Sequence, residues 1–238
     1  PNAFIAANIG GAQLIGGMPS NRLQSMINSI QANAVIVHLN PLQELIQPEG
    51  DTQFDGVLKG IEQLVNESSV PLIVKETGAG INSAVAKRLL NVGVKVIDVA
   101  GVGGTSWSRV EAARISSRPE TDKVGSTLTR KYELEMQERF NEWGNSTVYC
   151  LKSLQELAWE REFEIIASGG IRHAQDMIKA RCLGAHFVAV AQPVVRVLKE
   201  EGLKGLEKWF NLWRKEATMI MTLLGVREWR LLSEEHIT

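Results

Sequence analysis

Short apolar runs alternate with segments of helical spacing along the whole chain, and this alternation is its dominant pattern. Each run is four to six residues long and leads into a segment whose apolar residues recur every three or four positions. Continuous apolar strands that are each followed by a helix predict a parallel sheet buried on both faces. The six predicted strands are Phe4–Asn8, Ala34–Leu39, Val70–Lys75, Val94–Val99, Phe163–Ile166 and Phe187–Val190.

The segments between the strands carry recognisable helix starts and stops. Asn82 or Ser83 can cap one helix, which then ends at Gly93, and Asn145-Ser146 can cap another. The predicted helices are Arg22–Ile30, Val57–Val65, a helix from Asn82 or Ser83 to Gly93, a helix through Trp159, Ala174–Leu183 and an amphipathic tail from Leu203 to Leu224.

Six strands are too few for an eight-stranded barrel, so two architectures remain. One is an open doubly wound sheet, and the other is a TIM (β/α)8 barrel of which strands 3 to 8 are represented in this chain. The chain starts at Pro1, without a methionine, and enters a strand almost at once, which favours the barrel. We predict a single α/β barrel domain over residues 1–238, N-terminally incomplete. Residues 115–142 are predicted to form an exposed insertion, and the polar stretch Ile115–Arg130 is predicted to be a loop.

Composition narrows the class of protein. Hydrophobic residues make up 44% and charged residues 22% of the 238 residues, as in ordinary globular proteins. The formal net charge of −1 and the lack of a Lys/Arg block predict no nucleic-acid partner. No apolar run approaches the roughly twenty residues of a membrane span, and no signal peptide is visible. Cys150 and Cys182 lie in apolar helical contexts, which predicts a reduced, cytoplasmic protein.

Two turns follow the last two predicted strands and together indicate a phosphate site. Ala167–Arg172 (ASGGIR) opens a helix, and Val190–Pro193 (VAQP) closes the final strand. Paired glycines before a helix leave backbone N–H groups free at the positive end of the helix dipole. In barrels, the loops after strands seven and eight build the phosphate site. Either motif on its own is explained equally well as a tight turn that allows close backbone packing, without a phosphate.

Polar side chains gather where the other strands end, at the edge where α/β proteins bind ligands. His38 and Asn40 alternate, so a regular strand directs both to one side. Such a histidine is often only a hydrogen-bonded core residue, but Gln43 and Glu44 beside it favour a site. Glu44 offers an oxygen ligand for Mg²⁺, and the alternatives are a helix cap or a solvated carboxylate. The set is Asn8, His38, Asn40, Gln43, Glu44, Lys75, Glu76, Thr105, Arg172 and Gln192.

Lys75 ends an apolar strand, so its charge needs a partner. Adjacent strand residues point to opposite faces, which argues against a salt bridge to Glu76. An anionic ligand, such as the electron-rich edge of a reduced flavin, is the better partner. The glycine cluster Gly101–Thr105 could wrap a phosphate or a ribityl chain, and Thr105 would add a hydroxyl.

The combination of motifs resembles type 2 isopentenyl-diphosphate isomerase, from about Ala3 to about Leu224. The His-x-Asn-Pro-x-Gln-Glu element is the most specific, whereas Gly-Gly-Ile-Arg is shared with many flavin-binding barrels. The motifs, in the family's order, are His38–Glu44 (HLNPLQE), Pro48–Asp51 (PEGD), Val74–Glu76 (VKE), Asp98–Gly101 (DVAG), Gly103–Trp107 (GGTSW) and Ala167–Arg172 (ASGGIR).

The resemblance implies a flavoenzyme of isoprenoid biosynthesis that interconverts isopentenyl and dimethylallyl diphosphate by an allylic proton shift. It implies FMN, Mg²⁺, NADPH as the reductant and a homo-oligomer, a tetramer or larger. His38 and Asn40 line the catalytic pocket, Gln43 contacts the substrate and Glu44 binds the metal. The implied flavin-binding residues are Asn8, Lys75, Thr105, Gly169, Gly170, Ile171, Ala191 and Gln192.

The chain departs from the family pattern in two places. The first two strands, a Met-Thr-Gly-type flavin loop and a basic segment for the diphosphate are absent, and Gln192 stands where many relatives carry arginine. Two other hypotheses therefore stay open. One is an FMN-dependent oxidoreductase of the 2-hydroxy-acid oxidase type, which needs a base and an arginine over the flavin. The other is an inactive barrel fragment retained for assembly or phosphate binding.

Overall fold

The computed structural model describes residues 3–47, 49–116 and 127–237. Its six strands form one parallel sheet in the order β1-β2-β3-β4-β5-β6, so that each strand pairs with the next along the chain. A doubly wound sheet reverses its strand order at a switch point, whereas a barrel does not. The fold is therefore an arc of a (β/α)8 barrel, as predicted. The strands are β1 Ala6–Gly10, β2 Ala34–Leu39, β3 Leu72–Glu76, β4 Val96–Asp98, β5 Glu164–Ala167 and β6 Phe187–Val188.

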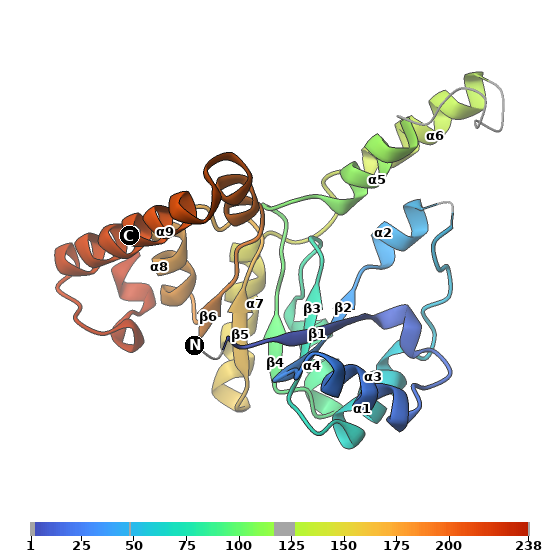
Figure 1. Ribbon diagram of the computed structural model, residues 1–238, viewed down its shortest axis with the longest axis horizontal. Helices are drawn as coiled ribbons and strands as arrows, with labels where there is room; N and C mark the ends of the chain where they lie inside the picture. The colour runs from blue at the N-terminus through green and yellow to red at the C-terminus, as the bar shows by residue number, and fades with distance from the viewer. Residues whose placement is uncertain (1–2, 48, 117–126, 238) are drawn as a thin grey trace.

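The helices follow the strands and lie around the sheet (Figure 1). Asn82 is the residue that caps α4, where its side chain accepts a hydrogen bond from the backbone N–H of Val85 at 3.1 Å. Ser146 caps α7 in the same way. The helices are α1 Ser20–Ser29, α2 Pro41–Ile46, α3 Val57–Glu67, α4 Ser83–Asn91, α5 Trp107–Ser116, α6 Thr127–Arg139, α7 Thr147–Glu160, α8 Ala174–Cys182 and α9 Gln192–Leu223, with short 3₁₀ turns at Gly11–Leu14, Trp229–Leu231 and Glu234–His236.

Only one face of the sheet is fully buried, so the prediction of two buried faces is wrong. Val37, Val74 and Ile97 stand in register on the helix-covered face and are fully buried. His38 and Lys75, on the opposite face, are only partly buried. The consecutive strand order puts the helices that cover the sheet on one side, and β1 and β6 do not pair, so the inner face lacks the opposing strands that would bury it in a closed barrel.

Two predicted segments differ from the observed helices. The loop predicted over Ile115–Arg130 is helical at both ends, because α5 runs to Ser116 and α6 starts at Thr127, while residues 117–126 lie outside the described residues. These two helices project from the body of the molecule (Figure 1). The tail helix α9 begins at Gln192 rather than Leu203, and Gly202, with φ 67° and ψ −165°, interrupts it. The non-helical glycine explains why the periodic pattern restarts at Leu203.

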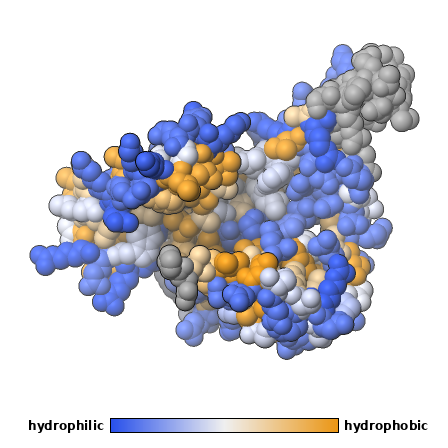
Figure 2. Space-filling view, viewed as in Figure 1, coloured by the Kyte–Doolittle hydropathy of each residue, from blue (hydrophilic) through white to orange (hydrophobic). Residues whose placement is uncertain are grey.

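Exposed apolar side chains gather over the first turns of α9 and near the start of β1 (Figure 2). Val195, Leu198 and Leu203 on α9, and Phe4 and Ile5 before β1, are all exposed. Trp209 and Trp213 lie 4.5 Å apart between ring centroids, and Trp213 packs against the core, as expected for packing residues. None of the described helices combines the length and the apolar character that crossing a membrane requires.

Leu154 provides a test of the core. Its side chain on α7 is fully buried, so we expect Leu154→Ala to lower the free energy of unfolding by about 2–5 kcal/mol. Trp159 lies on the same helix but is 88% exposed, and Trp159→Ala should change that free energy by less than about 0.5 kcal/mol. Urea unfolding followed by circular dichroism measures both. Equal effects of the two substitutions would contradict the packing of α7 against the sheet.

His186 predicts a pH dependence of stability. Its ring Nδ1 accepts the backbone N–H of Ile165 at 3.1 Å, and burial, with Arg181 nearby, lowers the pKa of His186 below its ordinary 6.5. A lowered pKa stabilises the fold above pH 6.5, and this contribution is lost as the pH falls through the folded-state pKa. The unfolding free energy should therefore drop between about pH 8 and about pH 5. His186→Asn keeps an acceptor that does not titrate, so a drop that is undiminished in this variant would assign the effect to other groups.

Candidate flavin and substrate site

A hollow of about 550 Å³ opens at the carboxyl ends of β3 to β6. Its size is typical of a site for a small molecule or cofactor. Seven of the eight predicted flavin-binding residues line it: Lys75, Thr105, Gly169, Gly170, Ile171, Ala191 and Gln192. The eighth, Asn8, is not among the lining residues, and its side-chain oxygen lies 2.9 Å from Nδ1 of His38. The hollow also includes residues that the predicted site did not contain, notably Asp98, Trp107, Ser168 and Arg196.

Three titratable side chains stand in one row across the sheet. His38 on β2 is in register with Lys75 on β3, which is in register with Asp98 on β4. Burial, helped by Lys75, lowers the pKa of His38, while Glu44 acts in the opposite direction. Burial raises the pKa of Asp98, and its hydrogen bond from Ser168 and the charge of Lys75 oppose that shift. The row therefore favours a neutral imidazole in register with Lys75, whose charge acts on both His38 and Asp98.

Lys75 and Glu76 point to opposite faces, as predicted. The Nζ of Lys75 donates to the backbone carbonyl of Glu76 at 2.6 Å and not to its carboxylate. The buried Glu76 carboxylate instead accepts backbone N–H groups of the following turn, including those of Thr77 and Gly78 at 2.5 and 2.6 Å. Burial raises the pKa of Glu76, and these backbone hydrogen bonds oppose the shift. Glu76 thus shapes the turn that lines the hollow.

The glycine turn after β5 combines close packing with free donors. Gly169 and Gly170 have φ of 88° and 90°, in the left-handed region, and a Cβ on Gly169 would lie 2.1 Å from the carbonyl oxygen of Gly101. In the described part of the chain, the backbone N–H groups of Gly169 and Gly170 have no protein acceptor. The N-terminus of α9 has no side-chain cap at Ala191 either. The turn therefore combines the close backbone packing and the free N–H groups that the sequence alone offers as alternatives. The free N–H groups suit an anion.

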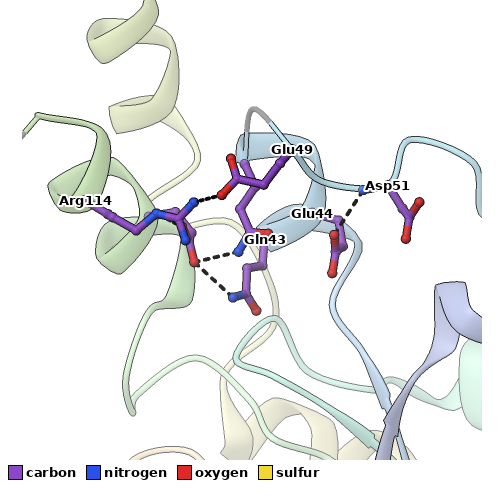
Figure 3. A network of polar contacts seen from close by, with 7 residues as sticks. Gln43, Glu44, Glu49, Asp51 and Arg114 are labelled. Atoms are coloured by element: carbon purple, nitrogen blue, oxygen red, sulfur yellow. Dashed lines mark hydrogen bonds and ion pairs between the residues drawn. The ribbon is translucent and has the colours of Figure 1, made fainter. Parts of the chain in front are cut away.

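Gln43 and Glu44 of the predicted polar cluster lie on α2 (Figure 3), whereas His38 lies on β2 and Asn40 is the N-cap residue of α2. A smaller hollow, lined by Leu42 of α2, shares Thr77, Gly78, Gly104, Thr105 and Trp107 with the larger one. The Nε2 of Gln43 donates to Glu111 at 3.1 Å. Glu44 accepts from Nδ2 of Asn40 at 2.8 Å and from the backbone N–H of Asp51 at 3.0 Å. His38, Asn40, Gln43 and Glu44 line neither hollow, and Leu42 of α2 connects this cluster to the smaller one.

Glu111 on α5 is the most buried acid of this cluster, and the sequence interpretation missed it. It is only 4% exposed and also accepts from Nε2 of Gln47 at 2.6 Å, while Arg114 pairs with both Glu111 and Glu49. The available signal was the spacing of Glu111 and Arg114, three apart on a helix. The spacing does not stand out in the sequence, because it lies next to the polar stretch predicted to be a loop.

The donor set for a metal is sparse. Among the described residues, no three His, Cys, Asp or Glu side chains come together in a way that could hold a metal ion. Glu44 is a single carboxylate with hydrogen bonds at both oxygens. Mg²⁺ commonly binds through one or two carboxylates together with substrate phosphates. The residues present therefore fit Mg²⁺ only where a phosphorylated substrate completes the ligands.

The consecutive parallel strands define an arc of a β/α barrel, and comparison with known proteins identifies its class. The chain belongs to the FMN-dependent dehydrogenase family, which matches residues 19–238. Solved structures agree on the fold. A flavocytochrome b2 variant with bound sulfite has a TM-score of 0.63 at 17% identity, covering 98% of this chain and 53% of that one. A mandelate oxidase variant with a monooxide FMN adduct has a TM-score of 0.53 at 18% identity, covering 87% and 55%.

Within that class, the similar curated proteins are isopentenyl-diphosphate delta-isomerases. The Thermococcus onnurineus protein is 39% identical over 231 residues, which cover 95% of this chain and 58% of the relative. The Chlorobium phaeovibrioides protein is 41% identical over 227 residues, which cover 94% and 61%. The chain thus spans about three fifths of the length of these relatives. The predicted resemblance to this isomerase family is confirmed.

Proposed function

We propose that the protein carrying this sequence is an FMN-dependent isopentenyl-diphosphate delta-isomerase of isoprenoid biosynthesis. The observation that carries the proposal is the position of α2, whose Leu42, next to Gln43 and Glu44, lines a hollow that shares five residues with the larger one. A flavin oxidoreductase needs no carboxylate and amide pair of this kind. The names of the curated relatives support the same activity.

The flavin-binding residues divide by the part of FMN that each would hold. The N–H groups of Gly169, Gly170, Ile171, Ala191 and Gln192 would bind the phosphate, because these residues line the hollow and the N–H groups of the first two have no acceptor among the described residues. Lys75 would lie against the electron-rich edge of the reduced ring, and Thr105 would add a hydroxyl. We also propose that Asn8 contacts the ring, since its partner His38 stands in register with Lys75.

The residues on and next to α2 would bind the substrate and the metal. When bound, reduced FMN supplies the group that donates and accepts the proton at the allylic carbons. Gln43 would contact the substrate, and Glu111 fixes the side-chain amide of Gln43 by accepting its N–H. Glu44 would bind Mg²⁺ and thereby orient the diphosphate, with its carboxylate held by Asn40. His38 and Asn40 would line the pocket.

Two further features belong to the proposal through the family resemblance. NADPH is the proposed reductant of the flavin, and the proposed assembly is a homo-oligomer of four or more subunits. The cytoplasm is the proposed compartment because Cys150 and Cys182 are free and buried. Light scattering on a sizing column would measure the oligomer. A monomer at micromolar concentration would contradict the assembly without affecting the proposed chemistry.

The deciding experiment is an isomerisation assay. The protein is titrated with FMN and followed by absorbance, then reduced and given isopentenyl diphosphate with and without Mg²⁺. Mg²⁺-dependent formation of dimethylallyl diphosphate is expected. A protein that binds FMN but forms no dimethylallyl diphosphate, and whose flavin is reduced by a 2-hydroxy acid, would instead be an oxidoreductase. Failure to bind FMN at all would contradict both activities and favour an inactive fragment.

A further inference from the structure

The glycine turn after β5 is held from behind by one residue of a distant helix. The hydroxyl of Thr147, the first residue of α7, lies 2.9 Å from the carbonyl oxygen of Ser168 and 2.6 Å from that of Gly169. Its single proton is shared between these two acceptors. Thr147 is 7% exposed and is not among the residues that line the hollow, so it acts only on the back of the turn.

Peptide planarity transmits this contact to the front of the turn. In a trans peptide, the C=O of one residue and the N–H of the next point in opposite directions. The carbonyl of Ser168 shares a peptide with the N–H of Gly169, and the carbonyl of Gly169 shares one with the N–H of Gly170. Because Thr147 draws both carbonyls toward α7, both N–H groups point away from α7, and they have no acceptor in the described part of the chain.

Neighbouring contacts hold the same arrangement. The backbone N–H of Gly101 donates to the carbonyl of Ser168 at 3.2 Å, and the hydroxyl of Ser168 donates to Asp98 at 2.6 Å. A Cβ on Gly101 would lie 2.4 Å from the backbone nitrogen of Thr147, so only glycine lets the start of α7 come this close. The turn, the Gly101 loop and α7 therefore pack as one unit.

We propose that Thr147 is a positioning residue that aims the N–H groups of Gly169 and Gly170 at the phosphate of FMN. This inference rests on the proposed function, since it takes FMN as the ligand. The residue does not cap its own helix, because Ser146 does so by accepting the N–H of Tyr149 at 3.2 Å. Two adjacent hydroxyls at the start of α7 thus have separable tasks.

The test compares FMN with riboflavin, which lacks the phosphate. Thr147→Val keeps the branched shape but removes the donor, so FMN affinity should fall about tenfold while riboflavin affinity stays within about twofold. Thr147→Ser keeps the hydroxyl and should restore the wild-type ratio of the two affinities. Ser146→Ala is the matched control, since it should lower the melting temperature and leave that ratio unchanged. If the valine variant does not fold, Thr147→Cys, a weak donor of similar size, replaces it.

The outcomes separate the inference from the proposed function. If the wild-type protein prefers FMN to riboflavin and the valine variant keeps the full preference, Thr147 does not position the turn. If FMN and riboflavin affinities fall together, the role of Thr147 is only structural and the inference is wrong. A wild-type protein that binds neither flavin, or both equally, would contradict the proposed phosphate site itself.

Discussion

Glu44→Gln is expected to lower isomerase turnover by about 10²–10³-fold, the range seen when one preorganised electrostatic contact, such as an oxyanion-hole donor, is removed from an active site. The amide keeps the shape and one acceptor for Asn40 or for the N–H of Asp51, but it loses the negative charge that would bind Mg²⁺. Steady-state rates measured over a series of Mg²⁺ concentrations check this result. FMN binding should be unchanged, because Glu44 does not line the flavin hollow.

Glu62→Gln is the matched control for this variant. It makes the same change in charge on an exposed side chain of α3, outside the network around Glu111. Turnover within about twofold of wild type is expected, because a substitution on an exposed surface position has little effect. If Glu44→Gln keeps full Mg²⁺-dependent turnover, or if both variants lose activity equally, Glu44 is not the metal ligand.

Gly169→Ala is expected to weaken FMN binding by roughly 10–100-fold, because two costs add. The residue has φ 88°, and its new Cβ would lie 2.1 Å from the carbonyl oxygen of Gly101. The turn must therefore shift, and the N–H groups that face the hollow shift with it. Equilibrium titration of the protein with FMN measures the loss.

Gly16→Ala is the control that separates the effect of backbone strain from the effect of a displaced turn. Gly16 has a similar φ of 83°, but a Cβ there would meet nothing within 4 Å. This variant should lose stability through backbone strain alone and bind FMN as wild type does. An undiminished affinity in Gly169→Ala would show that the turn does not carry the phosphate contact.

The network around Glu111 explains why the polar residues of α2 can act together. Gln43 and Gln47 both donate to this buried carboxylate, and Arg114 links it to Glu49 (Figure 3). A side-chain amide that donates to a carboxylate must direct its own oxygen elsewhere. The contact therefore settles which end of Gln43 remains free for a ligand.

The sequence by itself determined the strands and most helix ends. The runs of β-branched and other apolar residues located all six strands within two residues. A buried strand needs apolar side chains at its own positions, so its own sequence reveals it. Asn82 and Ser146 marked the starts of α4 and α7 for the same local reason, since a cap needs only its own next turn. Seven of the eight predicted flavin-binding residues meet in one hollow because parallel strands bring their carboxyl ends to one edge.

Only the tertiary structure decided what depends on chain segments far apart in the sequence. The single open face of the sheet follows from the order of strand pairing, which apolar runs do not encode. The pairing of Gln43 with Glu111 joins residues 68 positions apart, and that of Thr147 with Ser168 joins residues 21 positions apart. Propensity and spacing describe a residue's own turn or strand, whereas these contacts form only when separate β/α units pack side by side. The arc of the barrel can thus be predicted from the chain, but the way its turns are held cannot.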